Sequence, residues 1–84
     1  MKWIEIREKF PRQWLLVEAT GARSEGDRRI LETLAVLASF SDSTDAFDAY
    51  KQRHRETPDR ELYVLHTDRE QLDVKERAWM GIRA

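Results

Sequence analysis

FSDSTDAFDAY, residues 40–50, is the stretch that decides the fold, because a hydrophobic segment ends there and a helix begins. Ser43 is the predicted N-cap, since a serine oxygen at this position accepts a hydrogen bond from a free backbone N–H group. The aspartates that follow suit the positive end of the helix dipole. Pro58 ends the pattern, so the sequence predicts a helix over 43–57.

Two apolar windows lie on either side of this helix. Residues 62–65 read LYVL and residues 14–19 read WLLVEA, with no alternation of polar and apolar positions before Glu18. Such runs are typical of strands that are covered on both faces. The sequence therefore predicts a strand at 61–66 and a second strand at 13–20, and it favours the middle of the sheet for the second.

Residues 24–40 allow two interpretations. In the first, a turn at 24–27 closes a long hairpin, with Gly26 at a position that requires a positive φ. In this strand, Ile30, Leu34, Val36, Ala38 and Phe40 would share one face. In the second, a helix at 27–38 carries its apolar residues at helical spacing. We favour the hairpin, because too few strands would otherwise remain for a stable sheet.

These elements predict an α+β fold: a small antiparallel or mixed three-stranded sheet made of the long hairpin 13–40 and the strand 61–66, in the order 2-1-3. The helix 43–57 covers one face. The pattern Thr67-Asp68-Arg69-Glu70 resembles a capping box and predicts a short C-terminal helix. The terminal segments or a second copy of the chain must cover the other face, and we expect a homodimer.

Composition limits the function classes. The chain has 84 residues, which predicts a single domain over 1–84. It contains no cysteine, and its net charge of −1 gives no overall field that would attract nucleic acid. We expect no secretory signal, no membrane span and a cytoplasmic location. Residues 10–14 resemble segments of small bacterial proteins, a resemblance that implies a bacterial origin and no activity.

Candidate catalytic residues are few. His66 and Asp68 follow the last strand, where a histidine and a carboxylate together suggest a small hydrolase as one alternative. Helix capping by Thr67 and Asp68 explains the same residues more simply. No metal-ligand spacing is present, so we predict no metal and no cofactor.

A second alternative is nucleic-acid binding. The basic residues that would carry it are Arg28, Arg29, Lys51, Arg53 and Arg55. Stacking aromatic residues should accompany such a patch, and only Tyr50 lies near the denser run, on the face expected to be buried. We therefore consider nucleic acid an unlikely partner.

The remaining interpretation is a non-catalytic module that binds a protein or itself. Trp79, Met80 and Arg83 in the tail, together with Trp3, are the candidate contact residues, since tryptophan, methionine and arginine are enriched at interface cores. The sequence thus predicts a binding protein rather than an enzyme.

Overall fold

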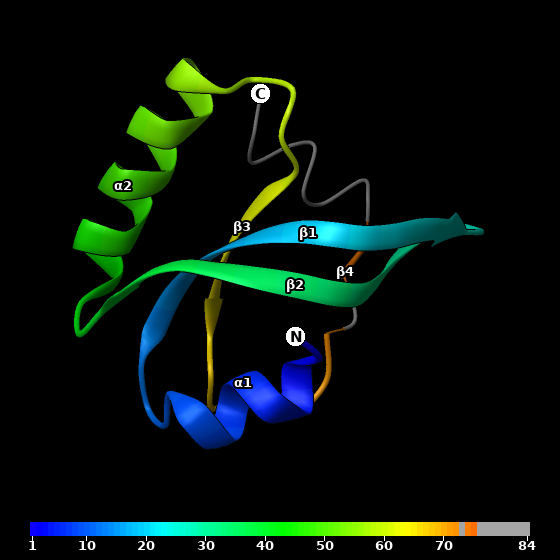
Figure 1. Cartoon of the computed structure of the whole chain (residues 1–84), viewed down its shortest axis with the longest axis horizontal. Helices are drawn as coiled ribbons and strands as arrows, with labels where there is room; N and C mark the ends of the chain where they lie inside the picture. Colours follow the sequence, from blue (N-terminus) through cyan, green and yellow to red (C-terminus); the bar gives the residue numbers. More distant parts are fainter. Residues whose placement is uncertain (73, 76–84) are drawn as a thin grey trace.

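The computed structural model describes residues 1–72 together with the backbone of residues 74 and 75. Two helices and four strands follow one another along the chain (Figure 1). They are α1 (Trp3–Lys9), β1 (Trp14–Glu25), β2 (Arg28–Phe40), α2 (Ser43–Glu56), β3 (Leu62–His66) and β4 (Val74–Lys75). The chain is therefore a small α+β fold, as the sequence predicts.

The four strands form one sheet in the order β3-β1-β2-β4. β1 is central and antiparallel to both β2 and β3, which confirms the predicted order 2-1-3. β4, which the sequence analysis did not foresee, pairs with β2 at Arg28 and Arg29. Gly26 closes the hairpin with a φ of +64°, as expected for a turn residue of this kind.

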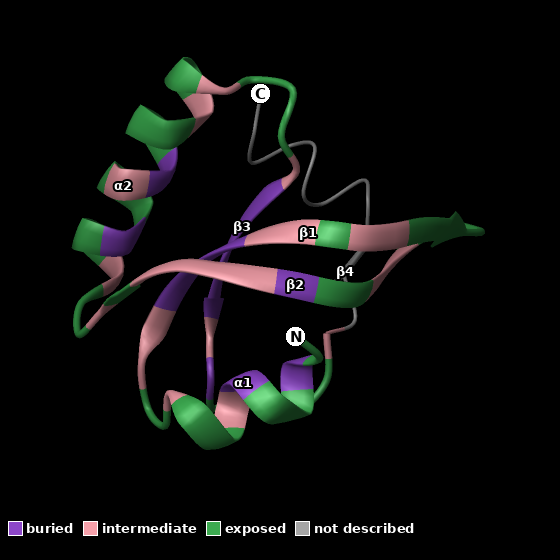
Figure 2. Cartoon of the chain, in the orientation of Figure 1, coloured by how far each residue is buried: buried purple, intermediate pink, exposed green. Residues whose placement is uncertain are grey.

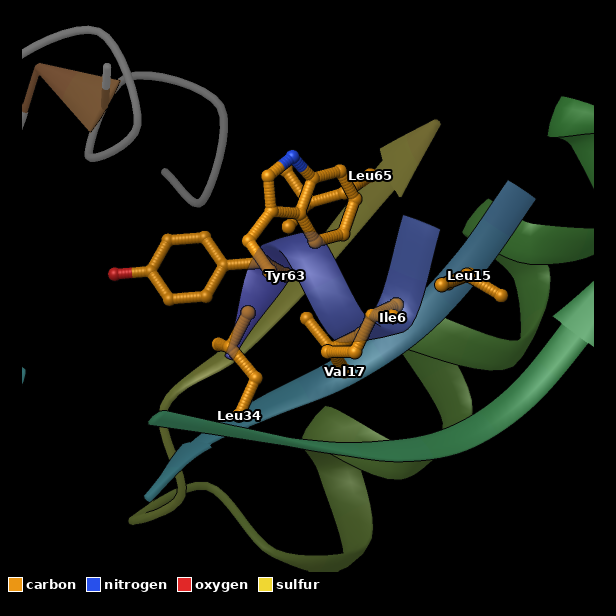
Figure 3. Packing of buried hydrophobic residues seen from close by; sticks show 7 residues of the cluster. Ile6, Leu15, Val17, Leu34, Tyr63 and Leu65 are labelled. Atoms are coloured by element: carbon orange, nitrogen blue, oxygen red, sulfur yellow. The ribbon is translucent and has the colours of Figure 1, made fainter. Parts of the chain in front are cut away.

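The N-terminal segment, ambiguous in the sequence, is a helix that covers one face of the sheet. Trp3 and Ile6 of α1 are buried against the strand residues of this face (Figure 3). The strand residues are Leu15, Val17, Leu34, Tyr63 and Leu65. This face therefore has a cover within the chain itself.

Helix α2 covers the opposite face, which confirms that part of the prediction. Ala46 and Tyr50 pack against Leu16, Leu62 and Val64. Figure 2 shows the buried positions of α2 on the side of the helix that faces the strands. The sheet thus lies between two helices, which explains why β1 and β3 are apolar on both faces.

The first irregularity of the hairpin is an extra residue in β2. Leu16 is paired with Ala38, whereas the next residue, Val17, is paired with Val36. Leu37 is therefore a β-bulge residue. An extra residue moves the following side chains to the other face of the sheet.

Two further irregularities of the hairpin lie on either side of Gly21. Gly21 is paired with Thr33 and Ala22 with Leu31, so Glu32 is a second extra residue of β2. Register is also shifted between Ala19 and Gly21. The hairpin twists and bends where these extra residues occur.

The bulges correct the predicted face of β2. The sequence placed Ile30, Leu34, Val36, Ala38 and Phe40 on one face. In the structure, Leu31, Leu34 and Val36 pack in the α1 cluster, whereas Leu37 and Phe40 pack in the α2 cluster. Strict alternation fails because each bulge reverses it.

The predicted helix start at Thr67 is also wrong for the described residues. Residues 67 and 68 form a turn, and residues 69–72 are irregular. The Thr67 hydroxyl accepts a hydrogen bond from the backbone N–H of Gln13 at 3.0 Å, so it is not available to cap a helix. In α2, the N-cap is Asp42 rather than Ser43, and its Oδ1 accepts from the N–H of Thr44 at 2.6 Å.

Candidate functional site

Four ring-bearing side chains meet at one end of the sheet, and we call them the aromatic row: Phe40, Trp14, His66 and Phe47. Trp14 is the first residue of β1 and is paired with Phe40 on β2 and with His66 on β3. The three rings therefore come from neighbouring strands at the same level of the sheet. Phe47 joins them from the first turns of α2.

Trp14 is in ring contact with two members of the row, His66 and Phe47. The centroids of Trp14 and His66 lie 5.0 Å apart with their planes at 79°, an edge-to-face arrangement. The centroids of Trp14 and Phe47 lie 6.5 Å apart. Both distances are within the range of favourable aromatic pairs.

None of the four side chains is buried. Phe40 and Trp14 are half-buried, and Phe47 is 37% exposed. The His66 side chain keeps 28% of its surface exposed. An aromatic cluster that extends from the core to solvent differs from the fully packed clusters in the middle of the sheet.

Local backbone features hold the aromatic row in place. Arg12 precedes β1 with a φ of +55°, a left-handed turn that leads the chain from α1 into the strand. The Asp42 cap fixes the start of α2 and so the position of Phe47. After His66, the N–H of Arg69 donates to the His66 carbonyl at 3.1 Å and closes a turn.

The surroundings of the aromatic row are acidic on the side of α2. Asp42, Asp45 and Asp48 are exposed, and residues 41–48 contain no lysine or arginine. Asp68, next to His66, has a side chain that is 70% exposed. Arg12, also exposed, is the cation of the turn that precedes β1.

His66 and Asp68, the candidate hydrolase pair, do lie together. The distance from His66 Nδ1 to an Asp68 carboxylate oxygen is 3.8 Å. However, Nδ1 accepts a hydrogen bond from the backbone N–H of Asp68 at 3.1 Å, which leaves the proton of the neutral ring on Nε2. A carboxylate that orients a catalytic histidine instead accepts a hydrogen bond from the Nδ1–H group, so the geometry is the reverse of that in a catalytic triad.

The basic residues of the nucleic-acid alternative fall into two separate groups. Lys51, Arg53 and Arg55 are exposed on α2, whereas Arg28 and Arg29 are at the hairpin tip. Figure 1 shows α2 and the tip of the β1–β2 hairpin at opposite ends of the molecule. The structure does not bring these five cations onto one surface.

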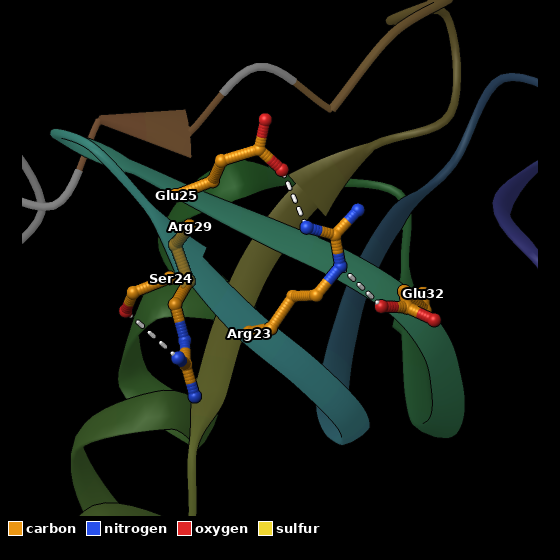
Figure 4. Close-up of polar contacts among 5 residues, drawn as sticks. All are labelled: Arg23, Ser24, Glu25, Arg29 and Glu32. Carbon is orange, nitrogen blue, oxygen red and sulfur yellow. Dashed lines mark hydrogen bonds and ion pairs between the residues drawn. The ribbon is translucent and has the colours of Figure 1, made fainter.

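Arg29 is also held by a carboxylate. Its Nε and one terminal nitrogen donate to the two oxygens of Glu61 at 2.9 and 2.7 Å, a bidentate pair. Its other terminal nitrogen donates to the Ser24 hydroxyl at 3.0 Å (Figure 4). This pairing joins β2 to the start of β3 across the central strand and neutralises the charge of Arg29.

Figure 4 also shows a surface ion pair network on the hairpin. Arg23 donates to Glu25 and, at 2.7 Å, to Glu32. These hydrogen bonds, first the one with Glu25 and then the one with Glu32, raise the pKa of Arg23. The network is exposed, so it contributes little to stability.

Tyr63 is a second partner of Glu61, the carboxylate that also binds Arg29. Its hydroxyl donates to Glu61 at 2.6 Å, and its ring packs in the α1 cluster. Burial, and second the hydrogen bond to Glu61, raise the pKa of Tyr63 well above its usual value. The contacts of Glu61 with Arg29 and Tyr63 are therefore structural links. The raised pKa of Tyr63 keeps its hydroxyl protonated.

The predicted contact residues are placed differently from the aromatic row. Trp3 is buried in the core, and its indole N–H donates to the Arg69 carbonyl at 2.7 Å. Its ring is therefore unavailable to a partner. Trp79, Met80 and Arg83 lie outside the described residues. The sequence analysis did not name Trp14, Phe40 or Phe47 as candidate contact residues, because the register that aligns them is not visible in any one segment.

Within residues 1–72, no group of histidine, aspartate and glutamate side chains is arranged to hold a metal ion. Neither α1 nor α2, the helices of the described part of the chain, has the length and apolar composition needed to cross a membrane. Comparisons with protein-family models, with curated proteins and with solved structures find no match to this chain.

Proposed function

We propose that this chain is a non-catalytic module that binds another protein through the aromatic row. The observation that carries the proposal is the contact of Trp14, His66 and Phe47 in a cluster that remains partly open to solvent. Aromatic side chains, tryptophan above all, dominate the binding energy of protein interfaces because they bury a large area with few rotatable bonds.

The position of the row supports the same proposal. Its rings are fixed by three strands and one helix, so little conformational entropy is lost when a partner covers them. The geometry of His66 and Asp68 gives no comparable support to a hydrolase. The basic residues lie on separate parts of the molecule, so they give no comparable support to a nucleic-acid surface.

Site-specific photo-crosslinking tests the proposal. Phe47 is replaced by p-benzoylphenylalanine in cells of the native host, and adducts are identified by mass spectrometry. We expect one dominant protein adduct that is lost when Phe40→Ala is added. The matched control places the same photo-reactive residue at Ile4, which is 65% exposed on α1. Equal labelling from both positions, or no adduct from Phe47, would overturn the proposal.

A mobility-shift titration addresses the nucleic-acid alternative. Binding with a steep salt dependence, weakened by Lys51→Gln and Arg55→Gln together, would replace our proposal by that alternative. We expect no shift at moderate salt.

Self-association and a cytoplasmic location remain predictions. The argument for a homodimer was an uncovered apolar face of the sheet, and α1 now covers that face. A dimer would therefore have to use another surface, such as the aromatic row or one of the edge strands of the sheet, β3 or β4. Light scattering at micromolar concentration measures the mass directly, and cell fractionation tests the location.

A further inference from the structure

We propose that the aromatic row recognises a cationic side chain, an arginine or a lysine, in an otherwise apolar segment of the partner protein. This inference rests on the proposed function and specifies the chemistry of the partner. The observations that carry it are the open ring cluster around Trp14 and the acidic residues on its α2 side and beside His66.

The rings supply one half of the recognition. A cation placed over the face of tryptophan or phenylalanine within about 6 Å of the ring centroid is attracted by the ring quadrupole. Trp14 is held edge-to-face against His66 and tilted by 50° against Phe47. Such tilted rings present surfaces in different directions, as the walls of a shallow aromatic site require.

The carboxylates supply the other half. Asp48 directly follows Phe47 and is exposed, and Asp68 follows His66 by two residues with 70% of its side chain exposed. The Asp68 carboxylate approaches His66 Nδ1 at 3.8 Å, and this nitrogen accepts a hydrogen bond from the Asp68 backbone N–H at 3.1 Å. The Asp68 carboxylate therefore lies beside the His66 ring, and Asp48 adds negative charge on the helix that carries Phe47.

Charge also argues against a second copy of this chain as the occupant. A two-fold interface brings the same patch of two molecules together. Here it would bring the acidic patch of one molecule, with Asp48 and Asp68, onto the acidic patch of the other, and like charges in contact oppose association. A basic segment of another protein meets the opposite charge.

Peptide titration followed by NMR tests the inference. The probe is a capped peptide with the core Leu-Arg-Leu-Arg-Leu, and its matched control has citrulline, a neutral analogue of the same shape, at both arginine positions. We expect saturable shifts of the Trp14 indole and Phe47 ring signals with the arginine peptide, and binding at least about fivefold weaker with citrulline. Equal binding of the two peptides, or shifts spread over the whole protein, would overturn the inference.

Charge variants of the protein give a second test, because the direction in which each one changes the affinity for the arginine peptide is predicted. Asp48→Asn and Asp68→Asn should each weaken arginine-peptide binding by about two- to fivefold, the size of an exposed ion pair. Arg12→Gln should strengthen it, because it removes a cation from the same end of the sheet. Asp27→Asn, at the hairpin tip, is the control and should change nothing. A uniform response to all four variants would contradict the inference.

The two proposals fail in different ways. If Phe47 crosslinks a partner in cells but the arginine and citrulline peptides behave alike, only the cation inference is wrong. If no partner is crosslinked and neither peptide binds, the proposed function is wrong as well.

Discussion

Thr67 is the residue at which three parts of the chain are joined. It is buried, its N–H and hydroxyl bond to the backbone of Gln13, and its carbonyl accepts from Arg7 Nε at 2.8 Å. These bonds tie the end of β3 to α1 and to the start of β1. The buried polar group is thus fully used, as buried groups of this kind must be.

Replacement of Thr67 by valine should lower the free energy of unfolding by about 1–3 kcal/mol, because the N–H of Gln13 loses its acceptor inside the protein. Urea denaturation measures the change. Thr67→Ser, which keeps the hydroxyl and removes only a methyl group, is the matched control and should cost less. A valine variant as stable as the serine variant would show that the hydroxyl has no structural role.

The raised pKa of Tyr63 makes stability depend on pH in the alkaline range. In the unfolded chain the phenol ionises near pH 10, whereas in the fold it stays protonated to higher pH. Below about pH 10 both states hold the proton and the contribution to stability is complete. Above it the unfolded state loses the proton first, so stability falls as pH rises.

Urea denaturation of the protein and of Tyr63→Phe between about pH 9 and pH 11 tests this linkage. We expect the free energy of unfolding of the unchanged protein to fall more steeply with pH than that of the variant, since phenylalanine has no proton to lose. The difference between the two slopes isolates Tyr63 from other groups that titrate there. Parallel curves would contradict the assignment.

At the scale of the elements, the sequence predicts the strands and α2 well because local signals and packing agree. An N-cap, a proline stop and apolar windows each point to the element that forms. The helix-like spacing of β2 is the instructive conflict. The residues at positions 31, 34, 37 and 40 follow a three-residue spacing, yet all four lie in a strand.

The bulges explain this spacing. An extra residue at Glu32 places Leu31 and Leu34 on one face, and an extra residue at Leu37 places the end of the strand on the other. A bulge depends on pairing with another strand, so one strand alone does not reveal it. Pairing with β1 therefore overrides the local period, and the face of β2 could not be predicted.

A substitution at Gly21 tests the packing of the bulged region of the hairpin. A Cβ atom at this position would overlap with Oγ1 of Thr33 on the paired strand. Gly21→Ala should therefore destabilise the protein by about 1–3 kcal/mol, the usual cost of overpacking. In a Thr33→Ala background the clash is absent, and the same substitution should cost much less. Thermal or urea denaturation of the four variants of this double-mutant cycle gives the coupling directly.

At the scale of the whole molecule, the candidate site depends on an arrangement that no single segment encodes. Trp14, Phe40 and His66 lie 26 or more positions apart in the sequence, and only the register of the three strands aligns them. The sequence analysis named Trp3 as a candidate contact residue, and in the structure Trp3 of α1 packs in the core as part of the terminal cover of the sheet.

The cover of the second sheet face is the last feature that sequence left open, and α1 provides it. Ile6 of α1 is fully buried against the sheet, whereas Ile4 on the same helix is 65% exposed. Ile6→Ala should therefore lower the free energy of unfolding by about 2–5 kcal/mol, because it leaves a cavity between the helix and the sheet. Ile4→Ala removes the same atoms from the surface and should change stability by less than about 0.5 kcal/mol.

Light scattering of the same two variants connects this cover to assembly. Loosening α1 by Ile6→Ala exposes apolar strand residues, and we expect its apparent mass to rise with concentration, as it does when an apolar face is left open. The Ile4→Ala protein should keep the mass of the unchanged protein at every concentration. If both variants lose the same stability and show the same mass, α1 does not shield the sheet, and a second copy of the chain becomes the better account of how that face is covered.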